Sequence, residues 1–259
     1  MTLSAERLAF IGITASECAV AAGIGKEAHP EALYKIKTGE LKRAKEDTPA
    51  TLHGKTMEPL ALQWYYDQTG NIVDESPFCI HPKYDWIGAT PDGLVKSPKF
   101  TGGATVVETS EPLLIEVKCP FLAGLIDYIP IHYMAQIQMQ LEVYDINMAH
   151  FWVYDHKSGR ASLWLVYRSR LFWSWMFRKL SFFWMCVLGK DPSLNIPYLF
   201  YETDALLKNG YRFNKRDTQK YARSQYPPRV HVIQLCDKIE IMTSKKRERE
   251  VNDDDDDNE

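Results

Sequence analysis

Cysteine is scarce in this sequence, and no motif pairs the cysteines that are present. The 259 residues include five cysteines, an odd number, and none of them belongs to a C-x-x-C pair. Neither a disulfide framework nor a zinc knuckle is therefore indicated, and we expect an intracellular, reducing compartment. The seven histidines have neither H-x-H nor H-E-x-x-H spacing, so no zinc site is expected.

Long apolar runs are also missing. The first ten residues contain a Glu and an Arg and no apolar stretch, so we expect no signal peptide. The most apolar stretch, Leu171–Leu188, has Arg178 and Lys179 in its middle, where a membrane-spanning helix would be strongly destabilised. We interpret this stretch as a buried helix and expect no membrane partner. Its aromatic residues could stack on DNA bases, but their helical spacing favours buried packing or a subunit interface.

A surplus of positive charge is absent as well. The formal net charge is -3, which argues against a protein that coats nucleic acid by bulk attraction. The segment 245–259 alone carries four basic and eight acidic residues, and without it 27 basic and 26 acidic residues remain. The rest of the chain is therefore nearly neutral, which still permits a local basic groove. We expect 245–259 to be a disordered charged tail that competes with DNA.

The basic end of that tail leaves two interpretations open. Lys245–Arg249 is either a nuclear import signal, which would place the protein in the nucleus of a eukaryotic host, or a solvated terminus.

The periodicity of apolar residues predicts an α+β fold, in which helices flank a mixed central sheet in an α/β/α arrangement. Helices are predicted at about Ser16–Gly23, Pro30–Lys37, Glu58–Thr69, His132–Tyr144 and Ser169–Leu188. Strands are predicted at Ile72–Cys79, Trp86–Ala89, Gly93–Lys96, Leu113–Lys118, Ala149–Tyr154 and Ser162–Tyr167. The segments 41–51 and 99–103 are predicted to be loops, and the chain after the last helix is predicted to be irregular.

The strand Leu113–Lys118 carries two charged residues among apolar ones. Because alternate residues of a strand share a face, Glu116 and Lys118 lie side by side. Alone, such a pair is typical of a half-exposed strand. Upstream, however, Asp92 lies in a Pro-Asp-Gly turn, and Asp followed by Glu-x-Lys is the arrangement of many metal-dependent nucleases. Two carboxylates can hold Mg²⁺ while the lysine orients water, and Glu58 can supply a third carboxylate.

The helix after that strand adds polar side chains to the same region. Its spacing places Tyr133, Gln136 and Gln140 on one face. A glutamine that faces an active site can hold a water molecule or a phosphate oxygen, whereas an isolated one is typical of a solvated helix surface. We take Gln136 as a site residue and Tyr133 as a DNA or phosphate contact.

Five short motifs resemble, in order and spacing, those of the YqaJ-like viral recombinase family, the lambda-exonuclease-like enzymes of the PD-(D/E)XK nuclease superfamily. The resemblance covers about residues 10–167. The motifs are Ile13–Ser16, Gly54–Lys55 with Glu58–Pro59, Gly88–Leu94, Ile115–Pro120 and Tyr133–Gln138. The resemblance implies a restriction-endonuclease-like core.

The resemblance also implies a role for each site residue. Asp92 and Glu116 resemble the metal-binding carboxylates, with the Val117 carbonyl as a further ligand, and Lys118 resembles the lysine that activates the attacking water. The remaining assignments are Glu58 and Gln136, which complete the site, and Ser16, whose hydroxyl contacts a terminal phosphate.

The activity that the resemblance implies is digestion of one strand of duplex DNA from its 5′ end with Mg²⁺, for which Mn²⁺ substitutes. This reaction leaves a 3′ overhang for a strand-annealing partner in viral recombination, and related enzymes are homo-oligomers. The alternatives are an endonuclease of the same superfamily and a non-catalytic scaffold that binds DNA ends. Retention of the acidic and lysine residues together argues against the scaffold.

Two features depart from related nucleases. The arginine that helps such enzymes to bind a 5′-phosphate is replaced by Ala9, so Arg7, Lys26, Lys35 or Lys37 is expected to serve instead. The cysteines do not supply the iron–sulfur cluster of Cas4-like nucleases. We therefore predict no such cluster. We predict a nuclease domain at 1–189, a C-terminal extension packed on it at 190–244 and the tail at 245–259.

Overall fold

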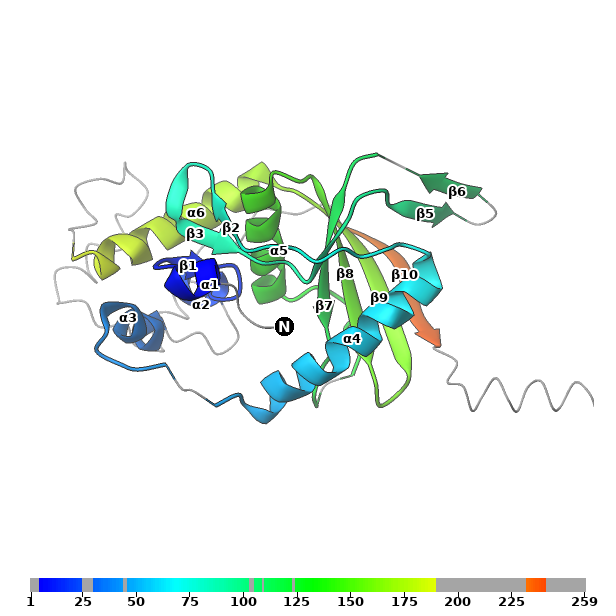
Figure 1. Cartoon of the computed structure of the whole chain (residues 1–259), viewed down its shortest axis with the longest axis horizontal. Coiled ribbons are helices and arrows are strands. Elements are labelled where there is room, and N and C mark those ends of the chain that lie inside the picture. The colour runs from blue at the N-terminus through cyan, green and yellow to red at the C-terminus, as the bar shows by residue number, and fades with distance from the viewer. Residues whose placement is uncertain are drawn as a thin grey trace, which may run out of the picture.

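The structure is a computed structural model that describes residues 5–24, 30–43, 46–102, 105–108, 110–122, 124–189 and 232–240. Its centre is a five-stranded sheet with the order β10-β9-β8-β7-β4 (Figure 1). In that order the strands span Val232–Glu240, Arg160–Tyr167, Met148–Asp155, Leu113–Lys118 and Gly93–Val95. The strand β7, which contains the Glu-x-Lys motif, therefore lies inside the sheet, between β8 and β4.

The sheet is mixed. β7 and β8 run parallel, whereas β4 with β7, β8 with β9 and β9 with β10 are antiparallel. Two parallel neighbours need a crossover connection, and the helix α5 (Ile131–Tyr144) lies in it. The connection brings α5 alongside β7 (Figure 1).

Each face of the sheet has its own hydrophobic cluster. On one face, β8 and β9 are covered by α5, by α6 (Arg170–Val187) and by the short helix α2 (Cys18–Ala21). On the other face, α4 (Pro49–Thr69) covers the sheet through Ala61 and Tyr65. This layered α+β arrangement confirms the predicted fold class.

The remaining elements surround this core. A second sheet has the order β1-β3-β2, and a separate two-stranded hairpin projects from the body (Figure 1). The second sheet consists of β1 (Ile13–Thr14), β3 (Tyr84–Ala89) and β2 (Cys79–His81). The hairpin consists of β5 (Lys99–Gly102) and β6 (Thr105–Glu108). The helices α1 (Ala5–Ala9) and α3 (Pro30–Thr38) both lie near the N-terminus.

The helix α4 begins nine residues earlier than the sequence predicts. Thr48 caps it by accepting a hydrogen bond from the Thr51 amide at 3.2 Å, and a proline occupies the first turn. Pro59 then lies in the middle of the helix rather than in its first turn, so that prediction was wrong. Because Pro59 is exposed, the carbonyl that loses its helical partner lies near solvent.

Three other predictions differ from the structure. The segment 72–79 is not a strand, because it pairs with the sheet only through a bridge between Asp74 and Leu94 before β2 begins at Cys79. Part of the predicted loop 99–103 is the strand β5. The chain beyond α6 is not irregular throughout, because β10 pairs with β9. Segments 190–231 and 241–259 lie outside the described residues, so the domain boundaries remain predictions.

The aromatic helix agrees with its prediction. The Ser169 hydroxyl caps α6 by accepting a hydrogen bond from the Phe172 amide at 3.2 Å, and the helix runs from Arg170 to Val187. Its largest side chains are buried, which confirms packing rather than base stacking for Phe172, Trp173, Trp175, Phe183 and Trp184. In the described part of the chain, no helix has both the length and the apolar composition that crossing a bilayer requires.

Candidate functional site

The strand β7 places two charged side chains on the face toward α5. Its odd-numbered residues pack against α4, so Glu116 and Lys118 point the opposite way, as predicted. Glu116 is 1% exposed, and the Lys118 side chain is 22% exposed. The Lys118 ammonium donates a hydrogen bond to Glu116 Oε1 and forms an ion pair with it. This pair neutralises a carboxylate that would otherwise be buried without a counter-charge.

Asp92 reaches the same place from the turn between β3 and β4. Its Oδ2 accepts a hydrogen bond from the Val117 amide at 2.7 Å, which fixes the carboxylate beside β7. The following residue, Gly93, has no room for a side chain, because a Cβ there would lie 2.1 Å from Val73 Cγ1. A glycine at this position therefore allows the chain to pass closely enough to hold Asp92 in the site.

The helix α5 contributes the third side of the site. Gln136 Nε2 donates to Glu116 Oε1 at 2.6 Å, and the Lys118 ammonium lies 5.3 Å from the centre of the Tyr133 ring. The sequence predicts both residues as members of the site. It does not predict the contact of Gln140 Nε2 with Glu116 Oε2 at 2.6 Å, although the helical spacing places Gln140 on the same face.

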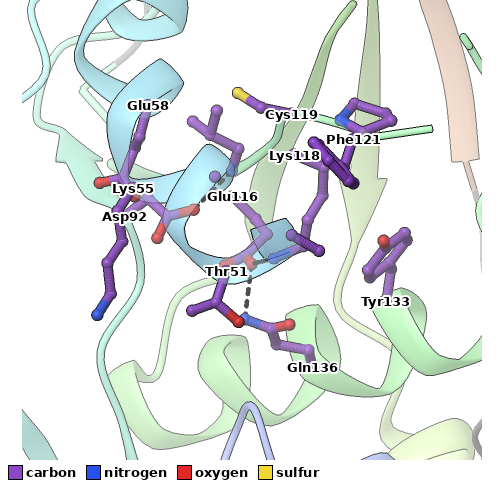
Figure 2. A pocket seen from close by; sticks show the side chains of 14 residues that line it. Thr51, Lys55, Glu58, Asp92, Glu116, Lys118, Cys119, Phe121, Tyr133 and Gln136 are labelled. Carbon is purple, nitrogen blue, oxygen red and sulfur yellow. Dashed lines mark hydrogen bonds and ion pairs between the residues drawn. The ribbon is translucent and has the colours of Figure 1, made fainter. Parts of the chain in front are cut away.

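Apart from Gln140, these residues line one open pocket of about 420 Å³. Figure 2 shows Glu58 entering it from α4, Asp92 from its turn, Glu116 and Lys118 from β7, and Gln136 from α5. The structure thus brings together every predicted catalytic and metal-binding residue. The pocket lining is Ala50, Thr51, Gly54, Lys55, Glu58, Asp92, Glu116, Val117, Lys118, Cys119, Pro120, Phe121, Tyr133 and Gln136.

Crowding of carboxylates dominates the electrostatics of the pocket. Burial and the charge of Glu116 raise the pKa of Asp92 well above its ordinary value, and the same two causes raise the pKa of Glu58. Burial alone would lower the pKa of Lys118, but the charges of Glu116 and Asp92 outweigh it and raise this pKa. The lysine is therefore an ammonium at neutral pH.

The donor set fits a hard divalent cation. Asp92 and Glu116 offer carboxylate oxygens and Val117 offers a carbonyl, which are the ligand types that Mg²⁺ prefers. A cation would also relieve the repulsion that raises the carboxyl pKa values. Among the described residues, no three His, Cys, Asp or Glu side chains are grouped closely enough to form a metal site. In the structure, the positive charge beside Glu116 is the ammonium of Lys118.

Ser16 and Arg7 are absent from the pocket lining. Ser16 is exposed, 3.2 Å from the Thr14 hydroxyl, and the Arg7 guanidinium lies 5.4 Å from the centre of the Phe78 ring. Burial lowers the pKa of Arg7, and the charge of Glu17 opposes this effect. These two predicted phosphate contacts thus lie on the N-terminal segment, outside the pocket, whereas the third, Tyr133, lines it.

The sequence does not identify Glu17 as the centre of a basic cluster. This buried carboxylate accepts from Lys37 Nζ at 2.9 Å and from the Thr14 amide at 3.0 Å, and it also pairs with Arg43. Lys37 was one predicted substitute for the missing arginine and belongs to this cluster. Another, Lys35, pairs with Glu31 on α3, and Lys26 lies outside the described residues.

Comparison with known proteins decides the family. The YqaJ-like viral recombinase domain matches residues 7–147. The chain belongs to the YqaJ-like viral recombinase family. All of the pocket-lining residues of this YqaJ-like chain fall within the matched segment.

Solved structures support the fold of the YqaJ-like chain. It superimposes on an alkaline exonuclease from Laribacter hongkongensis, LHK-Exo, with a TM-score of 0.54 and 23% identity over 77% of this chain and 93% of that one. The complex of LHK-Exo with dAMP gives a TM-score of 0.53 and 21% identity over 78% and 96% of the two chains. No curated protein sequence matches the chain significantly.

Proposed function

We propose that this protein is a metal-dependent deoxyribonuclease that hydrolyses phosphodiester bonds at the ends of duplex DNA. The observation that carries the proposal is the convergence of Asp92, Glu116 and Lys118 in one pocket, with Gln136 bonded to Glu116. Membership of a viral recombinase family and the fold shared with an alkaline exonuclease support it. The finer proposal is 5′-to-3′ digestion with Mg²⁺ or Mn²⁺ that leaves 3′ overhangs for recombination.

In this proposal Asp92, Glu116 and the Val117 carbonyl would hold the cation. When bound, a divalent cation would supply Lewis acidity toward the phosphate and the attacking water. Lys118 orients the attacking water and offsets the negative charge that develops on the phosphate, because the acidic neighbours keep it protonated. Glu58 and Gln136 complete the polar wall of the pocket.

The DNA end is proposed to contact the N-terminal segment. Ser16 offers an exposed hydroxyl, and Arg7 and Arg43 offer positive charge around Glu17. Burial raises the pKa of the Cys18 thiol, and the negative charges of Glu17 and Glu116 raise it further. Because both charges are close enough to affect Cys18, the N-terminal segment and the pocket are neighbours. Tyr133, on the pocket wall, is a further proposed DNA contact. A strand-annealing partner and a homo-oligomer belong to the same proposal.

The site is tested with two substitutions. Glu116→Gln removes a metal-binding charge, and Lys118→Met removes the ammonium that orients water. We expect either to reduce digestion of linear duplex by about 10²-fold or more while the circular dichroism spectrum stays native. Lys96→Met is the matched control, because Lys96 forms an exposed pair with Asp74 outside the pocket. Full activity of a folded Glu116→Gln protein refutes the site.

The substrate and polarity need a separate assay. We expect Mg²⁺-dependent release of label from the 5′ end of a linear duplex, abolished by EDTA, and no cutting of closed circular duplex. Substrates with and without a 5′-phosphate measure the contribution of the Ser16 segment. Equal rates on circular and linear duplex would favour the endonuclease, and tight end binding without any hydrolysis would favour the scaffold.

A further inference from the structure

Gln140 contacts the candidate site from behind the pocket. It lies on α5 one helical turn after Gln136, so the two amides share a face of the helix. Gln136 donates to Oε1 of Glu116 and Gln140 donates to Oε2, each at 2.6 Å. The α5 helix therefore holds both oxygens of one carboxylate.

The two glutamines differ in what else they can touch. Gln136 lines the pocket and can meet a substrate, whereas Gln140 is 0% exposed and does not line it. Gln140 Oε1 is buried and has no hydrogen-bond partner among the described residues. An unpaired buried acceptor is destabilising, and an apolar side chain would avoid it. The donor contact with Glu116 explains why an amide occupies this position.

The geometry points to Gln140 as a positioning residue for the metal-binding carboxylate. This inference rests on the proposed function, in which Glu116 holds the divalent cation. Glu116 is 1% exposed, so water cannot replace a lost donor at Oε2. Without the amide, the carboxylate turns toward another donor, and Oε1 no longer faces the pocket in the orientation that binds the cation.

The test is direct binding of Mn²⁺ to the full-length protein, followed by electron paramagnetic resonance of the free ion. Gln140→Met keeps the length of the side chain and removes its donor. Loss of a residue that orients a metal ligand typically weakens binding about 10–100-fold, and we expect a rise of that size in the Mn²⁺ dissociation constant. In digestion assays kcat should fall while the KM for duplex DNA stays constant, because Gln140 does not reach the pocket.

Gln138 provides a matched control on the same helix. It is also 0% exposed, but it donates to the Tyr167 carbonyl at 2.8 Å and accepts from the Ser169 amide at 2.7 Å, away from Glu116. Gln138→Met should lower thermal stability and leave the Mn²⁺ dissociation constant unchanged. Equal weakening in both variants would assign the effect to helix packing and overturn the inference.

Further outcomes are also decisive. A folded Gln140→Met protein with the wild-type Mn²⁺ dissociation constant overturns the inference, as does a wild-type protein that binds no Mn²⁺. If Gln140→Met does not fold, Gln140→Asn keeps the amide but shortens its reach, and it must show the same weakening. If Mn²⁺ binding by the wild type depends on Glu116 and Gln140 but the protein hydrolyses no DNA, the proposed function alone is refuted.

Discussion

His150 is buried in β8 on the face covered by α4. Its Nδ1 lies 2.6 Å from the hydroxyl of Tyr65, which also accepts from the Asn71 side chain at 3.3 Å. Asn71 in turn bonds the backbone of Lys99 through both ends of its amide, at 2.7 and 3.2 Å. These contacts connect the sheet, α4 and the β5–β6 hairpin through polar groups that are shielded from water.

Burial of His150 predicts a dependence of stability on pH. Burial lowers its pKa from 6.5 to about 3. Between these values the unfolded chain binds a proton that the folded chain does not, so the free energy of unfolding falls as the pH falls through this window. We predict a loss of about 2 kcal/mol from this residue between pH 7.5 and pH 5.

Urea unfolding at the two pH values measures this effect. The stability difference between the wild type and His150→Gln should shift by that amount, because glutamine does not titrate. His53→Gln, which changes a half-buried histidine, should shift less. Parallel profiles for the wild type and His150→Gln would contradict the prediction.

The sequence predicted residues that line the candidate pocket and predicted that Glu116 and Lys118 lie side by side, but it did not predict the partners that come from distant elements. Alternation along β7 predicts that Glu116 and Lys118 share a face, because it depends only on neighbours in the chain. Besides Lys118, two glutamines of α5, 20 and 24 residues away, donate to Glu116. Likewise, Glu17 acquires its role only when α3 and the loop after it bring Lys37 and Arg43 to it.

The first turn of α4 depends on its cap. Thr48 satisfies the Thr51 amide, and this turn forms part of the pocket wall. Thr48→Ala should lower the free energy of unfolding by about 1 kcal/mol, measured in urea, and increase amide exchange in the first turn. Thr56→Ala is the control, because the Thr56 hydroxyl bonds a carbonyl inside the helix and its loss should cost little. Equal losses in both variants would contradict a capping role.

The start of α4 was predicted too late because Pro59 was treated as a helix boundary. A proline inside a helix removes one hydrogen bond, which local propensity penalises. In the folded chain, Ala61 and Tyr65 pack on the sheet after the proline, and the Thr48 cap fixes the helix before it. Packing on the sheet and the N-terminal cap therefore outweigh the cost of a proline inside the helix. The helix propensities of single residues include neither contribution.

Ion pairs join the end of α5 to the start of α6. Glu142 accepts from Arg168 Nε at 2.8 Å and from Arg170 Nη1 at 2.7 Å, and only 5% of the Arg168 side chain is exposed. Glu142→Ala leaves Asp145, which accepts from Arg168 Nη1 at 2.6 Å, as the remaining acidic partner of that guanidinium, and the loss should be about 2 kcal/mol in urea unfolding.

An exposed pair provides the comparison for Glu142. Glu31 and Lys35 lie 2.8 Å apart on α3, with 49% and 45% of their side chains exposed. Glu31→Ala should cost less than about 1 kcal/mol. A small loss for Glu142→Ala, similar to that of Glu31→Ala, would show that the α5–α6 network does not stabilise the fold.

The edge of the central sheet depends on a segment from the C-terminal region. β10 pairs with β9 from Val232 to Glu240, so a chain that ends at residue 189 exposes the β9 edge. Exposed edges pair with other chains, and we predict concentration-dependent association of this truncation in light scattering. A chain that ends at residue 244 keeps β10 and should stay monodisperse or retain the wild-type oligomer. Identical behaviour of both truncations would refute a packed extension.

The pocket-lining residues are synthesised before part of the sheet that supports them. Its lining residues lie between Ala50 and Gln136, whereas β8 and β9, which complete the sheet beside β7, extend from Met148 to Tyr167. A growing chain therefore contains every lining residue, and the neighbour β4, before it contains β8, the other neighbour of β7. We therefore expect the carboxylates to be fixed in place only after Tyr167 has left the ribosome, so that a shorter nascent chain contains the residues of the site before the site has formed.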